Sequence, residues 1–170
     1  MAKSSSCVVL LSVKPRYAQA ILNGDKRCEF RRTRFSQQVD YILLYATRPV
    51  GMVVGIARVT EVTSGPLGDL WKRFSGIGGI TKHEYTKYFD GKHEGFVLSL
   101  GEVVLVSVNS SLVTLCRDKR PPQCFRYLDE ITANTVISEF AAHIHATDHR
   151  CPVLDDDENR RASQTIFLLR

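Results

Sequence analysis

Long apolar runs are absent from this chain. Its 170 residues contain no stretch close to the ~18 consecutive apolar residues that a membrane-spanning helix requires. The apolar segment 7–13 follows Lys3 and ends at Lys14-Pro15, so it is too short for a secretory signal. We therefore predict no membrane partner, a cytoplasmic location, and a buried strand over residues 7–13.

Cysteines are few and odd in number, and none of the five forms a CxxC pair. This pattern excludes a disulfide framework and a thiolate zinc finger. One other metal candidate remains near the C-terminus, where His145 and His149 are one helical turn apart and Cys151 is close. We favour the alternative, a polar helix end and loop, and predict no metal and no cofactor.

Common catalytic and nucleotide-binding motifs are also missing. There is no P-loop, HExxH, EF-hand loop or serine elbow. The glycine-rich stretch Ser75-Gly-Ile-Gly-Gly79 is not GxGxxG and does not follow a predicted strand. We therefore reject a dinucleotide-binding loop.

The distribution of charge is the first feature of the sequence that indicates a function. The formal net charge is +5. Residues 14–34 hold seven Lys and Arg against Asp25 and Glu29, so this segment carries the whole of that net charge. A basic stripe in an otherwise neutral chain indicates a polyanionic partner, with nucleic acid first. A solvated charged face is the alternative.

Hydrophobic periodicity predicts an α+β domain with a barrel-like sheet, because many short strands are interrupted by a few helices. In the strand 27–34, alternation places Glu29 and Arg31 on the face opposite Phe30. Gly55 marks a bulge or a close backbone approach. The other expected strands are 7–13, 40–47, 52–62, 95–100 and 103–108, and the expected helices are 15–22, 66–75, 80–90 and 131–146.

Several segments resemble the ASCH domain, a member of the PUA-like superfamily. They are Leu11-Ser-Val-Lys-Pro15, Ala20-Ile-Leu-Asn-Gly-Asp-Lys26, Glu29-Phe-Arg-Arg32, Leu43-Leu-Tyr-Ala-Thr47 with Pro49-Val-Gly51, and Pro121-Pro-Gln-Cys-Phe-Arg-Tyr-Leu128. The resemblance implies a PUA-like β-barrel with short helices at its ends, to which this chain adds a C-terminal helix. We predict a domain over 7–128, with 129–170 packed on it or docking a partner.

The resemblance also carries functional implications. ASCH relatives are thought to bind RNA or to accommodate a nucleotide in a cleft beside the first helix, and small members are often called predicted transcriptional regulators. One small relative is an amidohydrolase acting on N4-acetylcytidine, with a lysine, a threonine nucleophile three residues later and a distant glutamate. Lys26 matches that lysine, whereas Glu29 replaces the threonine, and a carboxylate does not simply substitute for a hydroxyl nucleophile. Glu84 corresponds to the glutamate only by its place in the fold.

We predict RNA or nucleotide recognition in a basic cleft, with RNA favoured over DNA, and make no prediction of oligomeric state. The alternative is an amidohydrolase-like enzyme with Lys26, Glu29 and Glu84 as catalytic residues. Lysines and arginines hold phosphates, Glu29 accepts from a base amino group, and Tyr45 stacks a base. A structural ion pair of Glu29 with Lys26 or Arg31 is the other interpretation. The predicted nucleic-acid-binding residues are Lys14, Arg16, Lys26, Glu29, Arg31, Arg32, Arg34 and Tyr45.

Overall fold

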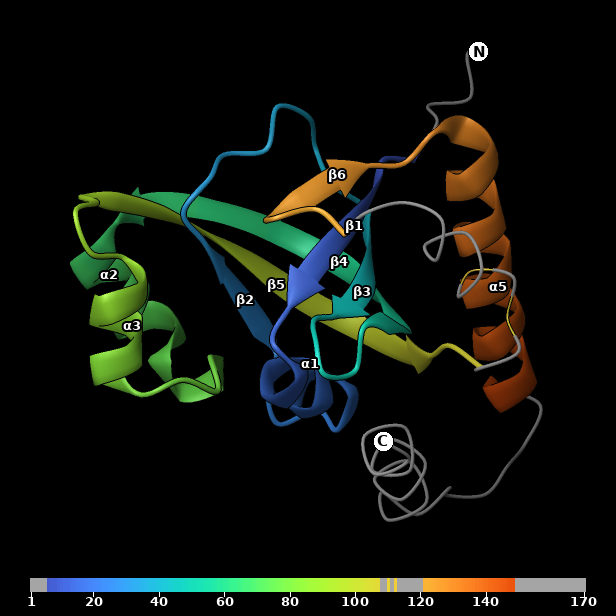
Figure 1. Cartoon of the computed structure of the whole chain (residues 1–170), viewed down its shortest axis with the longest axis horizontal. Helices are drawn as coiled ribbons and strands as arrows, with labels where there is room; N and C mark the ends of the chain where they lie inside the picture. Colours follow the sequence, from blue (N-terminus) through green and yellow to red (C-terminus); the bar gives the residue numbers. More distant parts are fainter. Residues whose placement is uncertain (1–5, 108–109, 111, 113–120, 149–170) are drawn as a thin grey trace.

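A curled six-stranded sheet forms the centre of the computed structural model, which describes residues 6–107, 110, 112 and 121–148 (Figure 1). The strands are β1 (Val8–Val13), β2 (Cys28–Arg31), β3 (Tyr41–Ala46), β4 (Met52–Pro66), β5 (Glu94–Leu105) and β6 (Phe125–Tyr127). They are ordered β2-β5-β4-β3-β1-β6. The β1–β3 pair is parallel and the other neighbours are antiparallel.

Helices cover both faces and one end of this sheet. They are α1 (Pro15–Leu22), α2 (Leu67–Phe74), the 3-10 turn η1 (Ser75–Ile77), α3 (Lys82–Tyr88) and α5 (Glu130–Asp148). In Figure 1 the long strands β4 and β5 run from α2 and α3 at one end of the molecule towards α5 at the other. No helix in the described part of the chain is long and apolar enough to cross a membrane.

Helix α1 begins and ends where the sequence predicts. Pro15 opens its first turn, Asn23 caps its C-terminus, and Gly24 adopts φ of +79° just beyond. At the end of α1, Leu22 packs against the backbone of β4. A Cβ on Gly55 would lie 2.6 Å from Leu22 Cδ2, and the β3–β4 register shifts beside this glycine. The prediction that Gly55 marks a bulge or a close backbone approach is therefore confirmed.

Strand β1 is buried on both faces because its side chains alternate between two core clusters. Val9 and Leu11 join the cluster beneath α1, whereas Val8 and Leu10 join the cluster beneath α5. A third cluster, around Phe30, joins β2 to α2 and α3. Alternation in β2 therefore leaves Glu29 and Arg31 on the face away from this third cluster, as predicted.

One strand prediction is wrong. The two strands expected at 95–100 and 103–108 form the single strand β5. Gly101 lies between the two expected strands but does not separate them; it lies where the β4–β5 register shifts, and a Cβ there would be 2.9 Å from Thr60 Cγ2. The glycine thus marks an irregularity inside a continuous ladder.

Candidate nucleic-acid interface

A cleft of about 720 Å³ lies between α1, β2, α3 and the segment before β6. This volume falls within the range of ~300–1,000 Å³ typical of ligand pockets. Six cationic and two anionic side chains line it, which gives a formal charge of +4 out of the chain's +5. The cations are Lys14, Arg16, Lys26, Arg31, Arg32 and Lys87, and the anions are Glu29 and Glu84.

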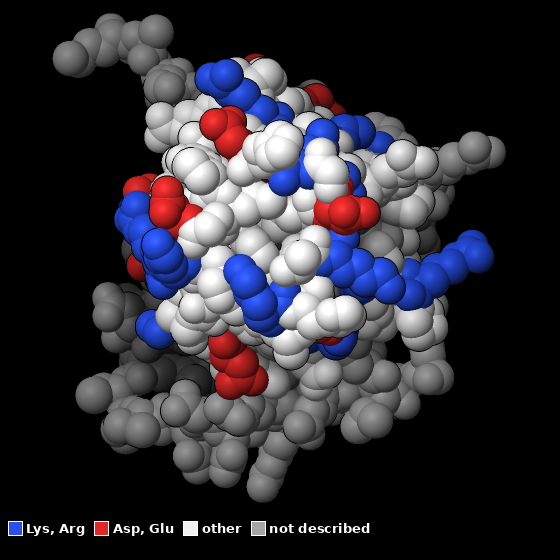
Figure 2. Space-filling view, turned by 90° about the vertical axis from the view of Figure 1, so that its left-hand side faces the viewer, with Lys and Arg blue, Asp and Glu red and all other residues white. Residues whose placement is uncertain are grey.

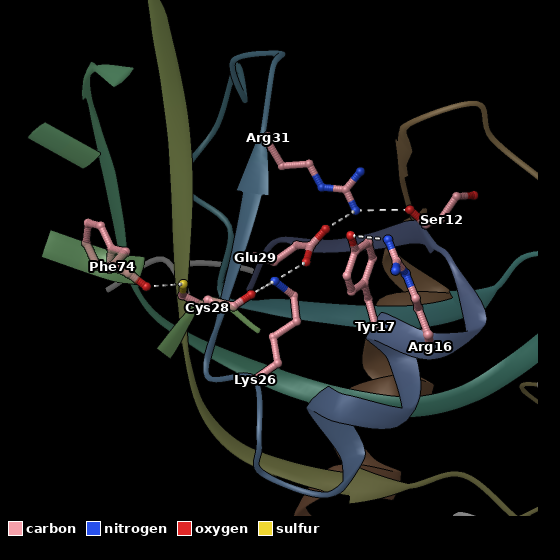
Figure 3. A network of polar contacts seen from close by, with 9 residues as sticks. Ser12, Arg16, Tyr17, Lys26, Cys28, Glu29, Arg31 and Phe74 are labelled. Atoms are coloured by element: carbon pink, nitrogen blue, oxygen red, sulfur yellow. Dashed lines mark hydrogen bonds and ion pairs between the residues drawn. The ribbon is translucent and has the colours of Figure 1, made fainter. Parts of the chain in front are cut away.

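The floor of the cleft is a buried ion triad (Figure 3). Glu29 Oε2 lies 3.2 Å from Lys26 Nζ, and Glu29 Oε1 lies 3.3 Å from Arg31 Nη2. Lys26 is 2% exposed, Glu29 8% and Arg31 7%. Both carboxylate oxygens are therefore engaged, and two cations against one anion leave an excess positive charge in a poorly solvated place. Such an excess is costly unless an anion is nearby.

Backbone carbonyls hold the two cations of the triad in place. Lys26 Nζ donates to the carbonyl of Gly78, and Arg31 Nη2 donates to the carbonyl of Ser12 at 3.0 Å. Arg31 Nε is buried and has no hydrogen-bond partner among the described residues. A Cβ on Gly79, whose φ is +57°, would lie 2.9 Å from Lys26 Cβ. The glycine-rich stretch after α2 thus allows the backbone to pack closely on this lysine.

Two aromatic side chains, Tyr17 of α1 and Phe30 of β2, lie equally close to Lys26 of the triad. Lys26 Nζ lies 5.3 Å from the Tyr17 ring centroid and the Arg16 guanidinium lies 4.4 Å from it. Arg16 Nη2 also donates to the phenol oxygen at 2.6 Å. Burial raises the pKa of Tyr17 and the positive charge of Arg16 partly offsets this, so the phenol is neutral near pH 7. The sequence places Tyr17 on the apolar face of its helix and does not indicate that its ring lies beside these cations.

Helix α3 brings a polar face to the cleft, of which only Glu84 was predicted from the sequence. His83 and Lys87 are four residues apart, as are Glu84 and Tyr88, and all four line the cleft. Residues with this spacing lie on neighbouring positions of one helix face. The signal is therefore present in the sequence, but only the tertiary structure shows that this face meets α1.

Glu84 is both a cleft residue and a helix cap. It forms a capping box with Thr81 at the start of α3, and its Oε1 lies 2.5 Å from Arg16 Nη2. The backbone hydrogen bond from Thr81, followed by the bond from Arg16, lowers the pKa of Glu84 to about 2. Its carboxylate is therefore ionised at neutral pH and is a poor proton donor.

Two predicted binding residues lie away from the cleft. Tyr45 is 8% exposed and belongs to the core cluster beneath α5, so the structure does not place it to stack a base in the cleft. Arg34 lines a separate hollow of about 350 Å³ together with Gln37 and Glu61. Strand β2 ends at Arg31, three residues earlier than predicted, and the side chains that follow no longer keep its alternation.

The face of the molecule shown in Figure 2 carries no continuous basic stripe among its described residues. Figure 2 shows the end of the molecule near α2 and α3, where Lys and Arg are interspersed with Asp and Glu. Of the seven basic residues in 14–34, five line the cleft, and only Arg27 and Arg34 do not. The positive excess is therefore concentrated in a concave site.

Metal ligands do not gather in the described part of the chain. No group of three or more His, Cys, Asp and Glu side chains there is suited to hold a metal ion. His149 and Cys151 of the zinc hypothesis lie outside the described residues, so that hypothesis stays a prediction.

Comparison with known proteins gives the family. The ASCH domain profile matches residues 11–108, more than half of the chain. The chain belongs to the ASCH domain family. This ASCH chain is 29% identical over 132 residues to the ASCH domain-containing ribonuclease of Zymomonas mobilis, covering 76% of the chain and 89% of that protein. It is also 30% identical over 91 residues to the large ribosomal subunit protein uL22 of Ureaplasma parvum, of which it spans 29%.

Solved structures agree with this assignment. The crystal structure of ASCH from Zymomonas mobilis matches with a TM-score of 0.69 and 28% identity, over 77% of this chain and 94% of that one. The predicted fold class, an α+β PUA-like domain with a barrel-like sheet and a C-terminal helix, is thereby confirmed. The predicted division into 7–128 and 129–170 stays a prediction, although α5 packs on the sheet through Val136 and Phe140.

The cysteines offer a direct chemical test of this arrangement. Cys124 is an exposed free thiol that lines the cleft, whereas Cys28 is buried in β2. Burial raises the pKa of Cys28 to about 11, so its reactive thiolate form is ~1000-fold less populated than the thiol at pH 8. We expect iodoacetamide at pH 8 to alkylate Cys124 in the folded protein and to leave Cys28 unmodified, as measured by peptide mass spectrometry.

Urea provides the control for this labelling, because both thiols are expected to react at similar rates in the unfolded chain. Equal labelling of Cys28 and Cys124 in the native protein would contradict the burial of β2.

Proposed function

We propose that this ASCH domain binds single-stranded RNA in the cleft between α1 and α3. The observation that carries the proposal is the +4 charge of a concave site whose floor is the Lys26–Glu29–Arg31 triad. The similarity to a Zymomonas mobilis protein named a ribonuclease, over most of its length, favours RNA over other polyanions.

Each part of the cleft has a role in this proposal. The exposed side chains of Lys14, Arg32 and Lys87 contact phosphates, which gives affinity without reading sequence. Tyr17 replaces Tyr45 as the aromatic surface on which a base stacks. Both oxygens of Glu29 are taken by Lys26 and Arg31, so it orients these cations instead of accepting from a base.

Fluorescence anisotropy with a labelled RNA and the matched DNA, each about a dozen nucleotides long, tests the proposal. Three to four phosphate contacts predict a slope of log affinity against log salt of about −2 to −3, so that affinity falls roughly 20- to 60-fold when salt rises fourfold. We expect RNA to bind more tightly than DNA and to slow alkylation of Cys124. Absence of RNA binding at low salt would refute the proposal.

RNA cleavage is a second candidate, favoured by the name of the Zymomonas mobilis relative. Cleavage needs positive charge beside the phosphate and a group that moves protons. The cleft holds the cations and one imidazole, that of His83. Shorter products from 5′-labelled RNA that has been incubated with the protein, and their loss in His83→Ala, would establish this activity.

The amidohydrolase hypothesis stays an alternative with less support. Lys26 and Glu29 are adjacent in the cleft, as the resemblance implies, but Glu29 is ion-paired on both oxygens and Glu84 is committed to a capping box. Chromatography of N4-acetylcytidine incubated with the protein would detect deacetylation. Transcriptional regulation and a cytoplasmic location likewise stay predictions.

A further inference from the structure

A second hollow of about 440 Å³ adjoins the cleft. Arg16, Tyr17, Ile80 and Glu84 line both spaces, so they form the ridge between them. The ion pair of Arg16 with Glu84 joins α1 to α3 along this ridge. Beyond the ridge the hollow is lined by Asp25, Thr81 and three residues of the glycine-rich stretch that follows α2, so Arg16 is the only cation among its lining residues.

The two partners of this ion pair are held very differently. Glu84 Oε2 accepts from the backbone N–H and the hydroxyl of Thr81, each at 3.0 Å, so the carboxylate is anchored to its own helix. The Arg16 side chain is 57% exposed, and its other contact is with its neighbour Tyr17. If the pair separates, Glu84 therefore stays in the capping box and Arg16 is the partner that moves.

We propose that the second hollow continues the RNA site, and that a phosphate of the bound strand replaces Glu84 as the partner of Arg16. This proposal rests on RNA binding in the first cleft. Exposed ion pairs are weak, so the exchange costs little, and a guanidinium binds phosphate through two parallel hydrogen bonds. The strand then passes over the ridge, and the site accommodates more nucleotides than the cleft alone.

Gly76 allows the hollow to be altered without touching the cleft. It lines the second hollow only, and a Cβ built on it meets nothing within 4 Å. The fold therefore does not require glycine at this position. Gly76→Asp adds a negative charge to the hollow, and Gly76→Asn adds a side chain of nearly the same size without charge.

The test compares two oligouridylates, one of about three nucleotides and one of about eight, which brackets the short end of the ~4–16 nucleotide sites of single-strand binders. We expect the unmodified protein to bind the longer strand roughly threefold to tenfold more tightly. Gly76→Asp should bind both strands with similar affinity, whereas Gly76→Asn should keep most of the preference for the longer strand. All three proteins should bind the short strand equally. Loss of the gain in both variants, with short-strand binding unchanged, also supports the hollow because either side chain then blocks it.

Equal affinity of the unmodified protein for both strands, or full gain in Gly76→Asp, overturns the extended site and leaves RNA binding in the cleft intact. Failure of both strands to bind any of the proteins instead refutes the proposed function.

The exchange of partners has its own test in Glu84→Gln, because glutamine still completes a capping box. This variant frees Arg16 and removes a charge that repels phosphate. We expect it to bind the longer strand about twofold to fivefold more tightly, the range given by an exposed ion pair. The matched control is Glu102→Gln, whose carboxylate pairs with the exposed Arg58 and does not line either space. Unchanged affinity in Glu84→Gln would show that Glu84 does not compete for Arg16.

Discussion

Replacement of Lys14, Arg32 and Lys87 by alanine in one protein is expected to weaken RNA binding about a hundredfold at 0.1 M salt. Each of these exposed cations lines the cleft and is assigned one phosphate contact. A contact with a single strand contributes ~0.7 to the slope of log affinity against log salt, so three contacts account for about two logarithmic units. The slope itself should fall by about 2, as measured by anisotropy titrations at several salt concentrations.

A second triple variant, Arg27→Ala with Lys72→Ala and Lys92→Ala, separates the cleft from the overall charge. It removes the same formal charge from exposed positions that do not line the cleft. None of the three is assigned a phosphate contact, and salt at 0.1 M weakens the attraction between exposed charges, so we expect its affinity to fall less than about threefold. Equal losses in the two variants would mean that RNA responds to net charge and not to this site.

Arg27 and Lys87 show how position in the sequence differs from position in the cleft. Arg27 belongs to the basic segment 14–34 but does not line the cleft, whereas Lys87 lies outside that segment and does line it. A count of charges along the chain therefore included five of the six cations that line the cleft and missed Lys87. Basic residues that are close in sequence therefore need not line the same cleft, and a residue from a distant segment can join them.

The local patterns predicted well those features that depend on neighbours in sequence. The end of α1 at Asn23-Gly24 follows from capping chemistry, and the shared orientation of Glu29 and Arg31 follows from strand alternation. A close approach or a bulge at Gly55 was predicted from the glycine alone, although the structure was needed to show that Leu22 of α1 is the neighbour. These inferences need only the backbone geometry of a single element.

The features that failed depend on what covers an element. Strand β3 is apolar on both faces, so its sequence does not tell which side chains point towards α1 and which towards α5, and Tyr45 points towards α5. The same applies to the polar face of α3. The spacing of its residues can be read from the sequence, but the sequence does not show that this face lies opposite α1. Sequence patterns define faces, and only the packed fold assigns each face to a cleft or to a core.

Glu29→Gln is expected to lower the free energy of unfolding by about 3–5 kcal/mol, the usual effect of breaking a buried ion pair. The substitution keeps the shape of the side chain but leaves Lys26 and Arg31 as two buried cations with no anion between them. At roughly 2–4 °C per kcal/mol for a chain of this size, Tm should fall by about 10 °C. The matched control is Glu61→Gln, whose carboxylate pairs with the exposed Arg73 and should change stability by less than about 1 kcal/mol.

Added RNA gives this prediction a second measurement. A polyanion that occupies the cleft supplies the charge that Glu29→Gln lacks, so saturating RNA should raise the Tm of the variant by more than it raises the Tm of the unmodified protein. Equal shifts would mean that the bound phosphate does not approach the triad. Unchanged stability together with complete loss of nucleoside deacetylation would instead make Glu29 a catalytic residue, because a group that supports only the fold cannot be removed without a change in Tm.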